Sequence, residues 1–91
     1  MADLVAVGDR TTMTSVYIIK SLSHNYRYVG ITDNLERRLF QHNHGRSKAT
    51  KGFAPFVLLN VEQFPNKKET RIREKFLKSG IGRKFLDNLV S

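Results

Sequence analysis

The sequence predicts one α+β domain in which helices cover a small three-stranded antiparallel sheet. Its 91 residues suffice for one modest hydrophobic core but not for two domains. Three segments rich in β-branched and aromatic residues have the length of strands, and a short polar turn joins the first two. Segments with helical periodicity and capping residues follow the second and third of them. The expected order of elements is therefore β-β-α-β-α-α.

The first two strands are expected at 14–21 and 26–31. The segment TSVYIIKS is β-branched and apolar enough for a buried strand, and YRYVGI alternates between two sets of side chains. Residues 23–25, SHN, have the chemistry of a turn, so the two strands should form an antiparallel hairpin. The segment FVLLNVEQF at 56–64, directly after Pro55, is expected to be the third strand.

The first helix is expected over 33–45. Asp33 and Glu36 stand three residues apart, which is the spacing of a capping box, and Gly45 can end the helix. The segment that follows, 45–54, is basic and rich in small residues. It is expected to be a loop.

Two further helices are expected near the C-terminus. Asn66 and Glu69 again have the spacing of a capping box, which predicts a helix over 67–79 that stops before Gly80. A short last helix is expected over 83–90.

The N-terminal segment differs from the rest of the chain. Residues 1–13 show no periodicity, so they are expected to form a disordered tail that precedes a domain over 14–90.

Charge is the most informative bulk property. Sixteen Lys and Arg against eight Asp and Glu give a net charge of +8 and a pI near 10.2. A domain this basic is expected to bind polyanions, with nucleic acid as the first candidate. A ribosome-associated protein or a merely solubilising surface are the alternatives. The basic residues form no dense amphipathic run, so no membrane partner is expected.

The composition and the motifs exclude several classes of protein. The absence of cysteine rules out disulfides, thiolate metal sites and a cysteine nucleophile. No apolar run is long enough to span a bilayer, and no signal peptide is recognisable, so a cytoplasmic location is expected. The sequence has no phosphate-binding glycine-rich loop, no dense metal cluster and no pattern of a serine triad, and no small-molecule cofactor is expected.

The first expected helix carries two polar side chains on its apolar face. Leu35, Arg38, Leu39 and His42 follow the i, i+3, i+4, i+7 pattern, so Arg38 should reach toward the strands that hold the tyrosines. Alternatively Arg38 extends past the core to solvent, and His42 is a surface or cap histidine.

Two glutamates on the second expected helix are candidate inward carboxylates. Periodicity places Glu69 near the stripe of Ile72 and places Glu74 beside Leu77, and it does not choose between them. Alternatively Glu74 forms an exposed ion pair with Lys78 at i, i+4.

The tyrosines of the expected hairpin resemble the two halves of the GIY-YIG nuclease motif. Tyr17 ends Ser-Val-Tyr, where the family has Gly-Ile-Tyr, and Tyr28 begins Tyr-Val-Gly, which ends at Gly30. The resemblance covers residues 14–90. It implies a GIY-YIG-like fold and is closest to small stand-alone bacterial members similar to the N-terminal cleavage domain of the bacterial excision-repair nuclease.

Three further features agree with this resemblance. Arg38 stands where the family has its helix arginine, and His42 begins HNHG, which is similar to the HN-x-G of the small members. The segment ETRIREKFLK resembles the family's helix EALxxExxIK. That match places the family's metal-binding glutamate on Glu74 and its upstream acid on Glu69.

The resemblance implies a one-metal hydrolysis of DNA. Glu74 would hold one Mg²⁺ (or Mn²⁺), and Arg38 would offset charge on the phosphate. Tyr17 would act as the base with Tyr28 as its orienting partner, and His42 would be a proton shuttle or a phosphate contact. Four basic residues are expected to hold flanking phosphates: Arg46, Lys48, Lys51 and Lys78.

Three functions remain open from the sequence. The first is a metal-dependent DNA endonuclease that cuts damaged or branched DNA. The second is a non-catalytic nucleic-acid-binding module on the same fold. The third is a structural protein that binds RNA or a protein partner through its basic face. The sequence leaves the oligomeric state unknown.

Overall fold

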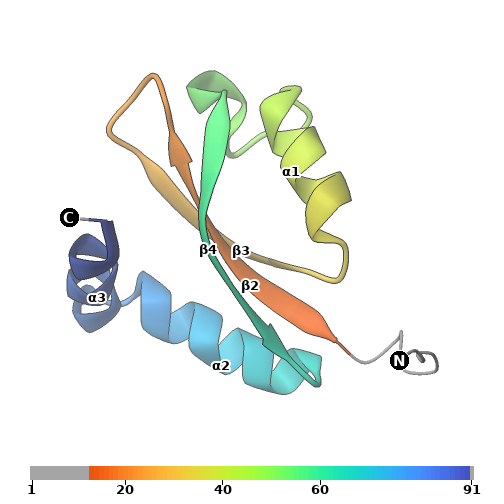
Figure 1. The fold of residues 1–91 in the computed structure, drawn as a ribbon, viewed down its shortest axis with the longest axis vertical. Coiled ribbons are helices and arrows are strands. Elements are labelled where there is room, and N and C mark those ends of the chain that lie inside the picture. Colours follow the sequence, from red (N-terminus) through yellow and green to blue (C-terminus); the bar gives the residue numbers. More distant parts are fainter. Residues whose placement is uncertain (1–12, 91) are drawn as a thin grey trace.

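The computed structural model describes residues 13–90, and it shows a three-stranded antiparallel sheet with helices on both faces (Figure 1). This confirms the expected α+β class and the order β-β-α-β-α-α. The expected tail lies, except for Met13, outside the described residues. The elements are β2 (Thr14–Ser21), β3 (Arg27–Thr32), α1 (Leu35–Asn43), a 3₁₀ turn η2 (Lys51–Phe53), β4 (Phe56–Phe64), α2 (Lys67–Lys78) and α3 (Gly80–Val90).

Strand β2 is the centre of the sheet, with β3 and β4 as its edges. It pairs antiparallel with both neighbours, and its residues are buried except for the partly exposed Lys20. Its continuous apolar run fits this position, because a central strand covered on both faces has no solvent side. The expected hairpin between β2 and β3 is present, and Tyr17 pairs with Gly30 and Ile19 with Tyr28.

The alternation along β2 divides the apolar residues between two cores. Val16 and Ile18 pack with Leu77 of α2 and Leu86 of α3 on one face of the sheet. Tyr17 and Ile19 lie on the other face in a second cluster: Tyr17, Ile19 and Phe56, with the partly buried Tyr26, Tyr28, Leu35, Leu39, Phe53 and Ala54 packed against it. In Figure 1, α1 accordingly lies across the sheet from α2 and α3.

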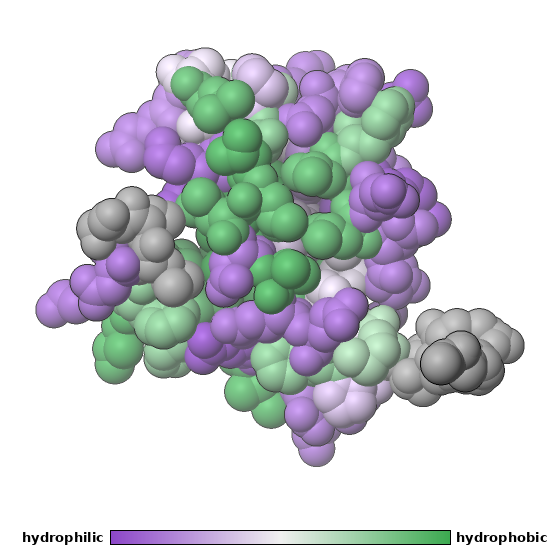
Figure 2. Space-filling view, in the orientation of Figure 1, coloured by the Kyte–Doolittle hydropathy of each residue, from purple (hydrophilic) through white to green (hydrophobic). Residues whose placement is uncertain are grey.

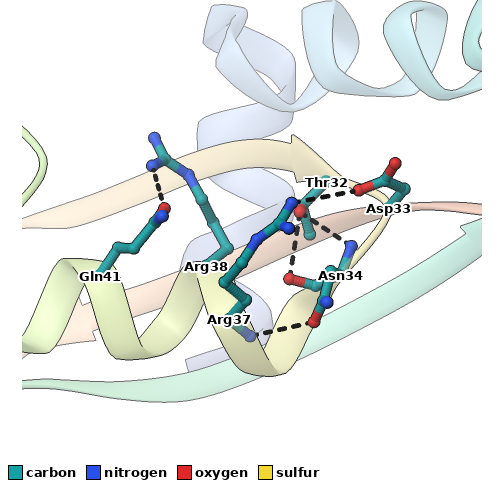
Figure 3. Close-up of polar contacts among 6 residues, drawn as sticks. All are labelled: Thr32, Asp33, Asn34, Arg37, Arg38 and Gln41. Atoms are coloured by element: carbon teal, nitrogen blue, oxygen red, sulfur yellow. Dashed lines mark hydrogen bonds and ion pairs between the residues drawn. The ribbon is translucent and has the colours of Figure 1, made fainter.

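The start of α1 differs from the sequence expectation. Asn34 is the N-cap, and its Oδ1 accepts a hydrogen bond from the Arg37 backbone N–H at 3.0 Å (Figure 3). The expected capping box of Asp33 and Glu36 is therefore wrong. Thr32 Oγ1 accepts from the Asn34 backbone N–H at 3.0 Å, and this turn brings Asn34 rather than Asp33 to the helix end. Asp33 instead lies 3.8 Å from Arg37 in an exposed ion pair.

The last helix is longer than the sequence predicted, because Gly80 and Gly82 lie within it. Asn66 caps α2 as expected, accepting from the Glu69 backbone N–H at 2.9 Å. Helix α3, however, begins at Gly80 rather than at 83. Ser79 Oγ accepts from the Gly82 backbone N–H at 3.1 Å, and a Cβ at Gly82 would collide with the backbone of α2. Gly82 thus permits a close approach of two helices instead of breaking one.

Helix α2 is tied to the edge strand β4 by an ion pair. Arg73 donates to both carboxylate oxygens of Glu62, at 2.7 Å and 3.0 Å. Strand β4 exposes Val57, Leu58 and Val61. Figure 2 shows apolar residues gathered near the middle of the face in view. Among residues 13–90 no helix has the length and apolar character needed to cross a bilayer.

Candidate functional site

Four of the side chains singled out in the sequence meet on the α1 side of the sheet. Tyr17 comes from β2, Tyr28 from β3, and Arg38 and His42 from α1. The Tyr17 and Tyr28 ring centroids are 6.3 Å apart, and the His42 ring lies 5.7 Å from the first and 5.1 Å from the second. The hairpin register makes this possible, because directly paired residues of two antiparallel strands point to the same face.

Gly30 provides the space in which the two phenols lie. It pairs with Tyr17, and a Cβ added at Gly30 would lie 2.5 Å from Tyr17 Oη and 2.9 Å from Tyr28 Cε2. Any side chain there would push the two rings apart. The glycine of the Tyr-Val-Gly segment is therefore required by packing of the tyrosines.

His42 is fully buried and connects two hydroxyl groups. Its Nε2 lies 2.8 Å from Tyr17 Oη, and its Nδ1 lies 2.7 Å from Thr50 Oγ1. A surface or cap position for His42, the alternative that the sequence allowed, is contradicted by its 0 % exposure. This burial favours a role in moving or holding a proton over direct contact with a phosphate.

Burial also determines the charge state of this histidine. Removal from water lowers the pKa of His42 to about 4, and the positive charge of Arg38 acts in the same direction. His42 is therefore neutral at pH 7. A neutral imidazole carries one N–H, so one ring nitrogen donates to its hydroxyl partner and the other accepts.

The Tyr17 phenol is protonated at neutral pH. Burial raises the pKa of Tyr17 above its ordinary value, and the negative charge of Glu74 adds to the rise, whereas the nearby Arg38 opposes it. Tyr17 can therefore take a proton from water only if it passes its own proton to another base. The Nε2 atom of His42 lies within hydrogen-bond distance for that transfer.

Arg38 leaves α1 in a different direction from its neighbour Arg37. Arg38 is half-buried and donates to Gln41 Oε1 at 2.9 Å, whereas Arg37 turns toward Asp33 (Figure 3). The positive charge of Arg38 lowers the pKa of His42 and opposes the rise in the pKa of Tyr17. Its half-buried side chain lies between the two positions that the sequence allowed, inward to the strands and outward to solvent.

The two candidate glutamates of α2 lie in different surroundings. Glu74 accepts from Lys78 Nζ at 3.0 Å, its side chain is 18 % exposed, and its charge acts on the pKa of Tyr17. Lys78 in turn lies 5.9 Å from the Tyr28 ring centroid. Glu69 is exposed beside the cap residue Asn66. The ion pair of Glu74 with Lys78, which was the alternative for Glu74, is thus present. The charge of Glu74, and not that of Glu69, also acts on the pKa of Tyr17.

Among the described residues, Glu74 is the acid near the tyrosines that could ligate a divalent ion. Within residues 13–90, no three His, Cys, Asp or Glu side chains are grouped closely enough to hold a metal ion. One carboxylate, such as that of Glu74, fits the habit of Mg²⁺, which keeps most of its waters and takes further oxygens from a phosphate.

The loop after α1 carries the other expected phosphate contacts. Arg46, Lys48 and Lys51 are all exposed, and Thr50 between the two lysines binds His42. The loop is therefore fastened to the site through Thr50, and its cations lie within a few residues of that contact.

Thr50 is the residue of the site that sequence reasoning missed. It is completely buried, and its position is held by two backbone hydrogen bonds, to Ser47 O at 3.2 Å and from Phe53 N at 2.9 Å. It belongs to a loop without periodicity, so no sequence pattern indicated that its side chain turns inward. Only its place between two lysines, as a polar β-branched residue in a basic loop, sets it apart.

We expect Thr50→Val to change the state of His42. Valine keeps the shape but removes the partner of Nδ1, and an unsatisfied buried polar atom costs about 1–3 kcal/mol of unfolding free energy. The change should also shift the His42 ring toward the Nε2–H tautomer, which ¹⁵N NMR of the ring reports. Thr50→Ser, which keeps the hydroxyl, should preserve the wild-type tautomer. A wild-type ring spectrum in Thr50→Val would contradict this role.

Comparison with known families gives a consistent result. The model of the GIY-YIG catalytic domain matches residues 13–84. A UPF0213 protein of Clostridium perfringens is 42 % identical over 67 residues, which cover 72 % of this chain and 71 % of that one. A UPF0213 protein of Oceanobacillus iheyensis is 41 % identical over 64 residues, which cover 69 % and 73 % of the two chains.

A solved structure has the same fold. The solution NMR structure of the UPF0213 protein BH0048 from Bacillus halodurans matches with a TM-score of 0.52 and 31 % sequence identity. The match covers 85 % of this chain and 84 % of that chain.

Proposed function

Because the chain belongs to the GIY-YIG family of nuclease domains, we propose that it is a metal-dependent endonuclease that hydrolyses phosphodiester bonds in damaged or branched DNA. The observation that supports this most strongly is the hydrogen-bonded series Tyr17–His42–Thr50 beside Arg38 and Glu74. A proton carrier, a cation and a carboxylate at one place can together activate water and offset charge on a phosphate. The net charge of +8 favours a polyanionic substrate.

The proposed proton path uses three side chains. Tyr17 takes a proton from the attacking water as its own proton passes to Nε2 of His42. The imidazolium that forms donates from Nδ1 to Thr50 Oγ1, which fixes the ring in the orientation needed to accept. Burial makes this imidazolium short-lived. It returns its proton to Tyr17 as Tyr17 releases the proton taken from water to the leaving oxygen, whose bond to phosphorus breaks, or to solvent.

The proposed charge stabilisation uses Arg38 and Glu74. Arg38 offsets the negative charge that grows on the phosphate in the transition state. Glu74 would hold a bound Mg²⁺, which as a Lewis acid polarises the phosphoryl oxygens. Tyr28, half-buried beside Tyr17, is the orienting partner of that phenol.

A non-catalytic DNA-binding module is the second candidate, and one observation favours it. Tyr17 is only 1 % exposed, so in the free protein its phenol is almost inaccessible to solvent. A nicking assay with branched and intact DNA, with and without Mg²⁺, separates the two. Mg²⁺-dependent product supports the endonuclease, whereas binding without product supports the module.

We expect Arg38→Ala to lose about 10²–10³-fold in cleavage rate while it still folds and binds DNA, because one preorganised charge partner is removed. Arg37→Ala is the matched control, since Arg37 is adjacent on α1 and carries the same charge but turns toward Asp33. It should cleave at close to the wild-type rate. Equal rates for the two variants would show that Arg38 has no special part in the reaction.

A further inference from the structure

A pocket of about 560 Å³ lies beside the candidate site, between β3 and the helices α2 and α3. The aromatic residues Tyr26 and Tyr28 line it along the edge strand β3, and Leu77 and Leu86 line it from the two helices. Its volume lies in the range of pockets that bind small organic ligands. Tyr28 belongs to both the pocket and the candidate site, so a group held in the pocket lies next to the tyrosines.

The lining of this pocket is positively charged. Three of the lining residues are cations, Arg27, Lys78 and Arg83, and within the described part of the chain no acid lines it. Arg27 is paired with Asp87 at 2.6 Å and Lys78 with Glu74 at 3.0 Å. Arg83 is exposed and forms no ion pair with another described residue, which leaves its charge available to a ligand.

The aromatic residues limit what can enter. Tyr26 is stacked on Phe53, with ring centroids 4.1 Å apart, so one face of the Tyr26 ring is covered and the ring is held in place. A flat ring that enters the pocket can stack on Tyr26 or Tyr28 while an attached anion meets the cations at the rim. A base in a duplex is already stacked and paired, and the whole duplex is too wide for a pocket of this size.

We propose that this pocket binds one unpaired nucleotide of a DNA strand, with its base against the tyrosines and its phosphate on Arg83. The choice of DNA rests on the proposed endonuclease function. The pocket would then select substrates in which a strand leaves the duplex next to the scissile phosphate, because Tyr28 places the unpaired nucleotide beside the reaction site. A flap, a fork or a gap has such a nucleotide, and an intact duplex does not.

The test measures binding without metal. The probes are a fluorescent oligothymidylate of about eight nucleotides and a blunt hairpin duplex, because single-strand sites on small domains span about 4–16 nucleotides. Arg83→Ala should weaken oligothymidylate binding by about tenfold, because it removes a charge-assisted hydrogen bond to a phosphate. It should also reduce the slope of log K against log salt by about 0.7, the share of one single-strand phosphate contact.

Lys84→Ala is the matched control, because Lys84 is the next residue of α3, is exposed, and does not line the pocket. It should leave that slope unchanged. Oligothymidylate should also shift the ring resonances of Tyr26 and Tyr28 in NMR spectra. Equal losses in Arg83→Ala and Lys84→Ala, or unmoved tyrosine rings, would overturn the proposal.

The test also distinguishes this inference from the proposed activity. If the oligothymidylate binds as expected but no DNA is cut, the endonuclease proposal is wrong and the proposal of a nucleotide pocket is supported. If DNA is cut but Arg83→Ala and Lys84→Ala bind the oligothymidylate equally well, the pocket proposal is wrong and the endonuclease proposal is supported.

Discussion

Glu74→Gln is expected to abolish Mg²⁺-dependent cleavage, with a loss of at least about 10²–10³-fold, and to weaken Mg²⁺ binding. The carboxylate lies close enough to Tyr17 for its charge to raise the pKa of that phenol, and glutamine keeps its size without its charge. DNA binding in the absence of metal should stay the same or tighten, because an acid next to the phosphates is removed. Calorimetry with Mg²⁺ alone measures the binding, independently of cleavage.

Glu69→Gln is the matched control for this prediction. Glu69 lies on the same helix, but it belongs to the cap, where its backbone N–H donates to Asn66 Oδ1 at 2.9 Å. Glutamine can still complete a capping box, so stability, Mg²⁺ binding and cleavage should all persist. Retained Mg²⁺ binding in Glu74→Gln with loss in Glu69→Gln would reverse the assignment.

Tyr17→Phe is expected to lower the cleavage rate by about 10²–10⁴-fold, the usual contribution of a general base. The phenylalanine ring fills the same space but has no oxygen to exchange protons with water. The change also leaves His42 Nε2 without its partner at 2.8 Å, so the unfolding free energy should fall by about 1–3 kcal/mol. Urea unfolding and single-turnover cleavage on branched DNA measure the two effects separately.

Tyr28→Phe provides the comparison, since Tyr28 has no hydrogen-bonded contact with His42 among those in the described structure. It should cleave faster than Tyr17→Phe and unfold at nearly the wild-type urea concentration. Tyr28 is the more exposed of the two phenols. A greater loss of cleavage in Tyr28→Phe than in Tyr17→Phe would therefore show that Tyr28, and not Tyr17, is the base.

Local patterns in the sequence were enough to predict most of the fold. Strands β2 and β4 occur with the expected bounds, because β-branched runs of strand length bounded by turn residues leave few alternatives. The Asn66 cap was also predictable, since a cap depends on residues three apart. Two helix starts were predicted wrongly. The start of α1 at the Asn34 cap depends on a competing turn, and the start of α3 at Gly80 depends on the packing of α3 against α2.

The sequence predicted which residues form the candidate site but not which contacts they make. The spacing of Tyr17 and Tyr28 in a hairpin, and of Arg38 and His42 on one helical face, follows from the periods of strand and helix. These periods hold within an element, so they also left Glu69 and Glu74 equivalent. Their different surroundings arise from how α2 lies against the sheet.

The contact of His42 with Thr50 was decided by tertiary structure alone. Thr50 lies in an aperiodic loop eight residues beyond His42, and its inward direction depends on how that loop folds against α1. The sequence by itself determined which elements form, where the tyrosines stand and that the surface is basic, because those properties depend on neighbours along the chain. The burial of His42, its neutral state and the pocket beside Tyr28 depend on elements far apart in the sequence, which only packing brings together.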